Sequence, residues 1–258
     1  MVSHLRPDVR IGEDIEKLSR AAAAAIHEEI GAAVARGRCD LALAGGKTPR
    51  LLYSFLATSL KGSGLAGSID IFWSDERFVP RSDPASNYRM ALETLIEPAG
   101  IDRSRVHPVP VGEGGPQQAA EAYERLLREH FFGPGAKTGV PAFDIVILGI
   151  GADGHTASLF PGDADPRDDS RQELVIATKA PSAGGPADRI SFNYGLIMAA
   201  RSVHLIATGG AKRDVIAILA ADAGSGDPAR GIPPLPAASI ISERATVLWV
   251  DREAAGAL

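Results

Sequence analysis

The stretch Phe143-Asp-Ile-Val-Ile-Leu-Gly-Ile-Gly-Ala-Asp-Gly-His-Thr-Ala-Ser158 passes from an apolar run into a glycine-rich segment. The run at 143–148 predicts a buried strand, and the glycines predict a turn at its carboxyl end. Open α/β sheets bind ligands at that edge. Asp153 and His155 are therefore candidate catalytic residues. His155 carries more weight, because imidazole exchanges a proton near neutral pH.

The glycines of this segment also fit a dinucleotide-binding fingerprint, with Gly149, Gly151 and Gly154 in G-x-G-x-x-G register. That fingerprint requires a helix at once and an acidic residue at the end of a second strand about 20 residues further on. Residues 159–162 and the polar run 163–171 intervene instead. The sequence thus disfavours a dinucleotide cofactor. A plain tight turn whose histidine caps a helix is the remaining alternative.

Length and composition are typical of a globular protein built as one large domain. The chain has 258 residues, of which 45% are hydrophobic and 23% charged. No stretch separates halves of differing composition, so we expect a single domain over residues 1–258. The net charge of -5 argues against nucleic acid or an anionic membrane as partner, while a local pocket for one phosphate fits this balance.

The cysteine content and the apolar runs indicate the cellular compartment of the protein. The single cysteine, Cys39, excludes an internal disulfide, and the strand-like run after it predicts a buried, reduced thiol. The first residues have no apolar signal-peptide core, and no run reaches the roughly 18 apolar residues that cross a bilayer. We therefore expect a cytoplasmic protein.

Helical and strand-like periodicities alternate along the chain. This alternation predicts an α/β fold, with a mostly parallel central sheet flanked by helices. Helices are expected at 14–36, 51–60, 87–96, 117–131 and 213–221, strands at 41–44, 69–73, 106–109, 143–148, 174–178, 190–192, 203–208 and 246–250, and loops at 112–116, 133–141, 180–188 and 224–236.

Two glycine turns precede predicted helices and offer sites for a phosphate. Gly45-Gly46-Lys47-Thr48 lacks the upstream glycine of a nucleotide-binding P-loop, because Leu41 stands there. Its backbone N–H groups and hydroxyl still suit one phosphate, although a plain turn with Thr48 as helix cap is the alternative. In the second turn, Lys212 opens a helix, where a cation is unfavourable unless an anion binds.

Three charged residues, Asp75, Glu76 and Arg77, follow the predicted strand 69–73 and so could face the same cleft as His155. A solvated loop is the alternative for them. His27, His107 and His204 are interpreted as structural. The chain lacks His-Glu-x-x-His and paired-cysteine patterns, so we expect no metal and no cofactor.

Four segments together resemble the 6-phosphogluconolactonases, in consistent order over roughly residues 10–252. They are Leu43-Ala-Gly-Gly-Lys-Thr-Pro49, Trp73-Ser-Asp-Glu-Arg-Phe-Val-Pro80 with Ser86-Asn-Tyr88, Gly149-Ile-Gly-Ala-Asp-Gly-His-Thr-Ala-Ser-Leu-Phe-Pro161, and residues 203–212. The resemblance implies a single Rossmann-like domain. It also implies hydrolysis of 6-phospho-D-glucono-1,5-lactone to 6-phosphogluconate in the pentose phosphate pathway, without metal or organic cofactor.

The candidate site residues follow from these segments and from the resemblance. His155, Asp153 and Arg77 are expected to be catalytic, with His155 as the base, Arg77 beside the developing oxyanion, and Asp153 either orienting the imidazole or holding the turn. The expected substrate-binding residues are Gly45, Gly46, Lys47, Thr48, Asp75, Arg189 and Lys212. Residues 190–194 depart from the family's usual run after Arg189, which weakens that one assignment. The partner is a small sugar-phosphate lactone, and the chain is expected to be a monomer or homodimer.

Two other functions compete with this one. Glucosamine-6-phosphate deaminases share the glycine turn and the Asp-Gly-His sequence, but carry a glutamate where this chain has Phe160. Proton transfer between sugar carbons needs that carboxylate, whereas lactone hydrolysis needs one base and cations that stabilise an anion. A non-catalytic sugar-phosphate sensor on the same fold is the second alternative.

Overall fold

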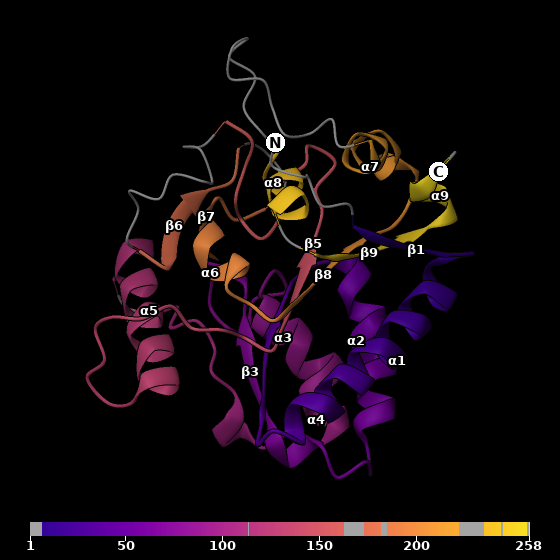
Figure 1. Ribbon diagram of the computed structural model, residues 1–258. Coiled ribbons are helices and arrows are strands. Elements are labelled where there is room, and N and C mark those ends of the chain that lie inside the picture. Colours follow the sequence, from indigo (N-terminus) through magenta and orange to yellow (C-terminus); the bar gives the residue numbers. More distant parts are fainter. Residues whose placement is uncertain are drawn as a thin grey trace.

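A six-stranded sheet, entirely parallel, forms the centre of the computed structural model (Figure 1). The structure describes residues 7–112, 114–162, 173–181, 185–221, 235–243, 245–256 and 258. The strand order is β1-β9-β8-β5-β2-β3, which confirms the predicted α/β class. The strands are β1 Asp8–Gly12, β2 Cys39–Leu43, β3 Ile69–Trp73, β5 Ile145–Gly149, β8 Ser202–Ala207 and β9 Val247–Asp251.

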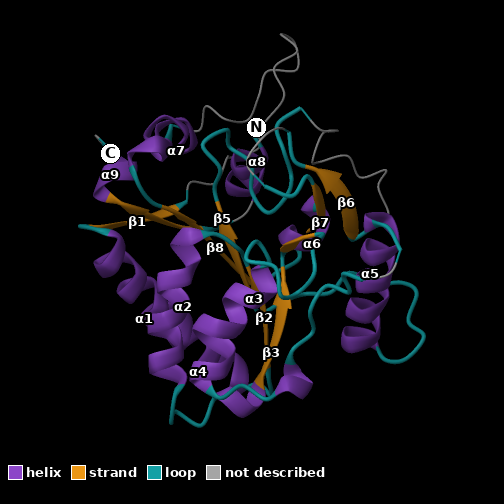
Figure 2. Cartoon of the chain, turned by 180° about the vertical axis from the view of Figure 1, so that it is seen from behind, coloured by secondary structure: helices purple, strands orange, loops and turns teal. Residues whose placement is uncertain are grey.

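Helices connect the parallel strands, and α1 and α2 lie side by side in both views (Figures 1 and 2). Asp14, expected as the first residue of the helix 14–36, is instead the cap of α1, because its side chain accepts the backbone N–H of Lys17. The helices are α1 Ile15–Val34, α2 Lys47–Leu60, α3 Asn87–Ala91, α4 Glu97–Ala99, α5 Pro116–Phe132, α6 Tyr194–Met198, α7 Arg213–Ala220, α8 Pro236–Glu243 and α9 Arg252–Ala255.

A second, antiparallel sheet in the order β4-β7-β6 was not expected from the sequence. It consists of β4 Asp75–Arg77, β7 Asp188–Phe192 and β6 Val175–Lys179. Residues 75–77 are thus a strand, and the solvated loop considered for them is wrong. Ser74 joins the sheets, because its N–H donates to Leu43 in β2 while its carbonyl accepts the N–H of Phe192. The strand β4 is held directly beside the end of the parallel sheet.

Several predicted boundaries are also corrected. Residues 106–109 make only an isolated bridge between Val106 and Ile71, so the expected strand is absent from this described segment. The expected helix 87–96 is α3 followed by a π-helical turn at 92–96. The structure adds β1, α6 and α8, which the sequence analysis missed. The polar run 163–171 and most of the expected loop 224–236 lie outside the described residues.

The core is continuous on both faces of the parallel sheet. Every residue of β2 and β3 is buried, including the polar Asp40 and Asp70 near their amino ends. Cys39 is buried as predicted, and burial raises the pKa of its thiol. None of the helices that the structure describes is long and apolar enough to span a membrane.

Candidate active site

A cavity of about 490 Å³ lies at the carboxyl ends of β2, β5 and β8, the edge at which the sequence places the chemistry. The loop after each of these strands contributes to its wall, and β4 closes one side. Eight of the ten candidate site residues line it: Gly45, Gly46, Lys47, Thr48, Asp75, Arg77, His155 and Lys212.

His155 and Asp153 form a contact pair in the loop after β5. The Nδ1 of His155 lies 2.6 Å from Oδ1 of Asp153, which also accepts the backbone N–H of His155 at 3.2 Å. Gly151 gives this pair its space, because a Cβ there would lie 2.1 Å from Nδ1 and 2.4 Å from the Asp153 carboxylate. The loop turns back at Gly151, whose N–H donates to the carbonyl of His155.

The contacts of Asp153 are compatible with both roles considered for it, because its Oδ1 accepts the backbone N–H of His155 in the turn and also lies against Nδ1 of the imidazole. Burial alone would raise the pKa of the Asp153 carboxyl, but the backbone N–H and the ring of His155 hold that pKa below its usual range. An ionised Asp153 accepts the proton of Nδ1, which leaves Nε2 of His155 as the basic nitrogen.

The loop that carries His155 stores backbone strain at Ala157. Ala157 has φ of 49°, the single positive φ outside glycine among the described residues, and it lines the cavity. Hydrogen bonds on both sides fix it: Thr156 Oγ1 donates to the Gly149 carbonyl and Ser158 Oγ donates to Asp75 Oδ2. The side chain of Asp75 thus anchors the loop that carries His155 to β4, and its other oxygen accepts from the Asn87 amide.

The first glycine turn is shaped by a close approach of Asn87. A Cβ at residue 45 would lie 1.8 Å from Oδ1 of Asn87, so only glycine fits there. Gly46 has φ of 107°, a conformation that side chains rarely adopt. Tyr53 anchors the strand end by bonding both the N–H and the carbonyl of Ala44. Lys47 and Thr48 begin α2, so their backbone N–H groups lie at a helix N-terminus that lines the cavity.

The second glycine turn presents Lys212 to the same cavity. Gly209 donates its N–H to both carboxylate oxygens of Asp251, at 3.0 Å each, which fixes the turn. Burial lowers the pKa of Lys212, and the charge of Asp153 partly offsets this. Within the described residues, no carboxylate pairs directly with Lys212. This partly desolvated cation suits an anionic ligand.

Asp75, Glu76 and Arg77 do not all face the cavity, because β4 sends alternate side chains to opposite sides. Glu76 is turned away and accepts backbone N–H groups of Arg77, Asn87 and Tyr88. Burial raises the pKa of Glu76, although these three N–H groups act in the opposite direction. Arg77 lines the cavity and donates to the Ala85 carbonyl, while its buried Nε has no partner in the described part of the chain.

Arg189 lies beside the cavity rather than in its wall. It pairs with Arg77 in the β4–β7 register, and burial together with the charge of Arg77 lowers its pKa. Asp153 also lies outside the cavity wall and acts on it through His155.

Sequence reasoning missed four residues that build the site. Asn87 and Ser158 position Asp75, Thr208 bonds Thr48 through their hydroxyls, and Asp251 holds the second glycine turn. The available signal was positional, since Thr208 and Asp251 both stand at carboxyl ends of parallel strands. Nothing local indicated the partner of either side chain.

Comparisons with known proteins show which family this chain resembles. The model of the family described as glucosamine-6-phosphate isomerases/6-phosphogluconolactonase matches residues 13–249. The 6-phosphogluconolactonase of Mycobacterium leprae is 35% identical over 96% of each chain, and that of Treponema pallidum is 39% identical over 70% of this chain and 72% of its own. The structure of 6-phosphogluconolactonase from Trypanosoma cruzi superposes with a TM-score of 0.80 at 29% identity, covering 99% of this chain and 98% of that one.

The family model spans nearly the whole chain, and its matched region contains every residue of the cavity described above. A solved glucosamine-6-phosphate deaminase, at 20% identity and a TM-score of 0.78, shares the fold. On these grounds the chain belongs to the glucosamine-6-phosphate isomerase/6-phosphogluconolactonase family.

Proposed function

We propose that this protein hydrolyses 6-phospho-D-glucono-1,5-lactone to 6-phosphogluconate, a step of the pentose phosphate pathway. One observation carries the proposal: a single cavity joins an Asp153-oriented histidine to a glycine turn at a helix N-terminus and to the cations Arg77 and Lys212. A base, a phosphate site and a charge for the oxyanion are what this reaction requires. Its relatives with curated 6-phosphogluconolactonase names support it further.

In the proposed mechanism, Nε2 of His155 takes a proton from a water molecule, whose oxygen attacks C1 of the lactone. The tetrahedral intermediate then breaks the bond between C1 and the ring oxygen. The imidazolium returns its proton to that leaving oxygen, so His155 ends neutral. The ionised Asp153 on Nδ1 stabilises the imidazolium between these two proton transfers.

Lys212 and Arg77 are assigned to different ends of the substrate, the phosphate and the lactone carbonyl. The turn Gly45–Thr48 and Lys212 would hold the phosphate, and Arg77 would offset the charge on the oxyanion. The unpartnered Nε of Arg77 supports its assignment, because a buried N–H donor without an acceptor is costly unless a ligand supplies one. Asp75 is better explained as the anchor of Ser158 than as a ligand of the phosphate, since a carboxylate repels that group. Arg189 would strengthen the local positive charge from the next strand.

The side chain next to the histidine favours lactone hydrolysis over deamination. Phe160, which stands where the deaminases carry their glutamate, is 8% exposed, and its ring centroid lies 5.0 Å from that of His155. Phe160 cannot move a proton between sugar carbons. Ammonia release from glucosamine-6-phosphate should therefore be undetectable.

The test follows loss of freshly generated lactone with and without protein, corrected for spontaneous hydrolysis. His155→Ala should lower kcat by about 10²-fold or more, because general base catalysis commonly contributes about 10²–10⁴. Circular dichroism and the melting temperature verify that the variant is folded. If His155→Ala kept activity within twofold, His155 would not be the base. If the parent protein bound 6-phosphogluconate but did not hydrolyse the lactone, it would instead be the sugar-phosphate sensor. A cytoplasmic location and a monomeric or homodimeric state remain predictions.

A further inference from the structure

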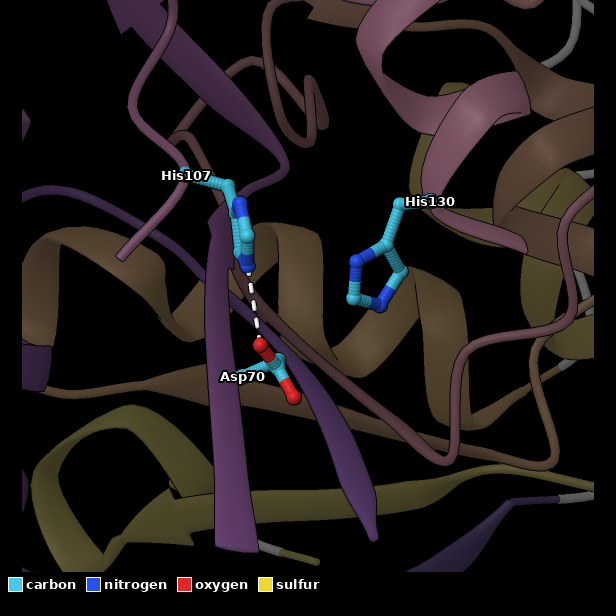
Figure 3. Close-up of side chains that lie close together, drawn as sticks. All are labelled: Asp70, His107 and His130. Atoms are coloured by element: carbon cyan, nitrogen blue, oxygen red, sulfur yellow. Dashed lines mark hydrogen bonds and ion pairs between the residues drawn. The ribbon is translucent and has the colours of Figure 1, made fainter. Parts of the chain in front are cut away.

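A second group of titratable side chains lies at the opposite edge of the parallel sheet from the active site. Asp70, near the amino end of β3, meets His107, which follows the 3₁₀ turn at 103–105, and His130, in the last turn of α5 (Figure 3). One donor atom from each lies within 4.8 Å of the other two. From the sequence, His107 was interpreted as structural, and neither the family resemblance nor the proposed reaction uses these three residues.

We propose that Asp70, His107 and His130 form a binding site for a divalent transition-metal ion, with zinc as the best match. Two imidazoles and one carboxylate are a donor set that zinc accepts, with a fourth position for water. Tetrahedral zinc ligands lie about 3.3 Å apart, and Asp70 Oδ1 is already 2.9 Å from His107 Nε2. The contacts with His130 need to close by about 1.5 Å at most, a movement within reach of a side chain.

The tautomer of His130 is set by a contact outside the trio. Nε2 of His130 lies 2.7 Å from Oδ1 of Asp40, so Asp40 accepts its proton and Nδ1 is left for the ion. In Figure 3 this Nδ1 is on the side of the ring that faces His107. A carboxylate on the far nitrogen of a ligating histidine is the usual outer partner of a zinc ligand. Arg105 holds Oδ2 of Asp70 at 2.8 Å, which leaves Oδ1 for the ion.

The rings are also held in place by packing. His107 stacks on Phe72 with centroids 4.6 Å apart, and His130 meets the edge of the same ring at 4.9 Å. The backbone N–H of His107 donates to Ile71 in β3, so His107 and Asp70 are fixed to one strand. Such pre-organisation lowers the cost of assembling three ligands.

Charge and access both permit a cation here. The four arginines nearby are each paired with a carboxylate: Arg36 and Arg201 with Asp144, Arg38 with Asp40, and Arg105 with Asp70. A surface cavity of about 870 Å³ borders Asp70 and His130, so an ion can enter from solvent and keep a water ligand. A bound ion would join β3, the 106–111 segment and α5, and would therefore stabilise the folded protein.

The test measures zinc binding by calorimetry and thermal unfolding on EDTA-treated, dialysed protein. The parent should bind one equivalent, and zinc at a hundredfold excess over Kd should raise Tm by about 5–10 °C. His107→Gln and His130→Gln should each weaken binding at least tenfold, and the zinc-induced shift should disappear in both. Because the readout is the shift within each variant, a lower starting Tm does not obscure it.

Two matched histidine variants separate this site from others. His27→Gln removes a histidine of α1, and His155→Ala removes the catalytic one; both should keep the zinc-induced shift. Lactone hydrolysis at 25 °C should be unchanged in His107→Gln and His130→Gln, so failure of this site and failure of the proposed function are distinguishable. The proposal is overturned if the parent shows no zinc-induced shift, if both cluster variants retain it, or if His155→Ala abolishes it.

Discussion

Adding one methyl group at Gly151 should disable the catalytic pair without unfolding the protein. The backbone at Gly151 is not left-handed, so alanine is tolerated there by the main chain itself. Its Cβ would nevertheless lie 2.1 Å from His155 Nδ1 and 2.3 Å from Cε1. Restoring an ordinary contact of 3.4 Å requires the imidazole to move by about 1.3 Å, away from Asp153 or away from the cavity.

A displacement of about 1 Å at a reacting group can cost 10²-fold in rate. We therefore expect kcat of Gly151→Ala to fall about 10²-fold, close to the loss expected for His155→Ala, with Tm lowered by only a few degrees. The assay is decay of freshly generated 6-phosphogluconolactone at saturating concentration, with the spontaneous rate subtracted. Substrate-induced protection against thermal unfolding reports whether the phosphate site still binds.

The matched control is Gly149→Ala, which adds the same methyl two residues earlier, at the last residue of β5. A Cβ at Gly149 meets no atom within 4 Å. Since Gly149 lines the cavity, this variant can raise KM, but kcat should stay within about threefold of the parent. Equal kcat values for folded Gly151→Ala and the parent would refute the placement of the His155–Asp153 pair at the reacting centre.

Three further predictions concern charge. Lys212→Ala should chiefly raise KM, because a phosphate remote from C1 is held equally in the ground and transition states, whereas Arg77→Ala should also lower kcat. Steady-state kinetics measure both parameters, with the exposed Arg125→Ala as the control. A fall in kcat for Lys212→Ala and a rise in KM alone for Arg77→Ala would show that the two roles are exchanged. The N–H and ring of His155 hold the pKa of Asp153 below its usual range against the effect of burial, so the Asp153 carboxylate stays ionised at weakly acid pH. Because the proposed base must be neutral, kcat/KM should fall on the acid side with the uptake of one proton, and it should survive EDTA. An acid limb that requires two protons would contradict this. Glu76→Ala leaves the buried N–H groups of Asn87 and Tyr88 unpaired, so it should lower the free energy of unfolding, measured by urea titration, by about 3 kcal/mol. A change below about 0.5 kcal/mol would show that the first turn of α3 does not depend on this carboxylate.

The longer helices and strands were predictable because the apolar residues of each one show which of its faces is buried. The spacing of apolar residues in 15–34 and the unbroken apolar run 145–148 determine which faces leave water, whatever they pack against. The alternation of these elements then predicted a parallel sheet, and a parallel sheet places its ligands at the carboxyl edge. The residue pattern and the family resemblance together thus proposed ten site residues, of which eight line one cavity.

The second sheet was not predictable, because β4 is three residues long and has no periodicity of its own. Its partner β7 lies more than 100 residues away, and the two strands meet beside Ser74, which bonds Leu43 through its N–H and Phe192 through its carbonyl. The same dependence on distant neighbours explains why Asp75 and Glu76 could not be told apart. Asp75 accepts a hydrogen bond from Ser158 in the loop that carries His155, and Glu76 accepts one at the N-terminus of α3.

The sequence by itself determined the fold class and the glycine turns, and it predicted which histidine transfers the proton, because each of these depends on local residue chemistry. The tertiary structure decided which carboxylate anchors a loop, which caps a helix, and which arginine lies in the cavity wall. It also brought His107 and His130 to Asp70, three residues without any shared sequence pattern. Hydrogen-bond partners are chosen by distance in the folded chain, and that distance is set by packing between elements far apart in sequence.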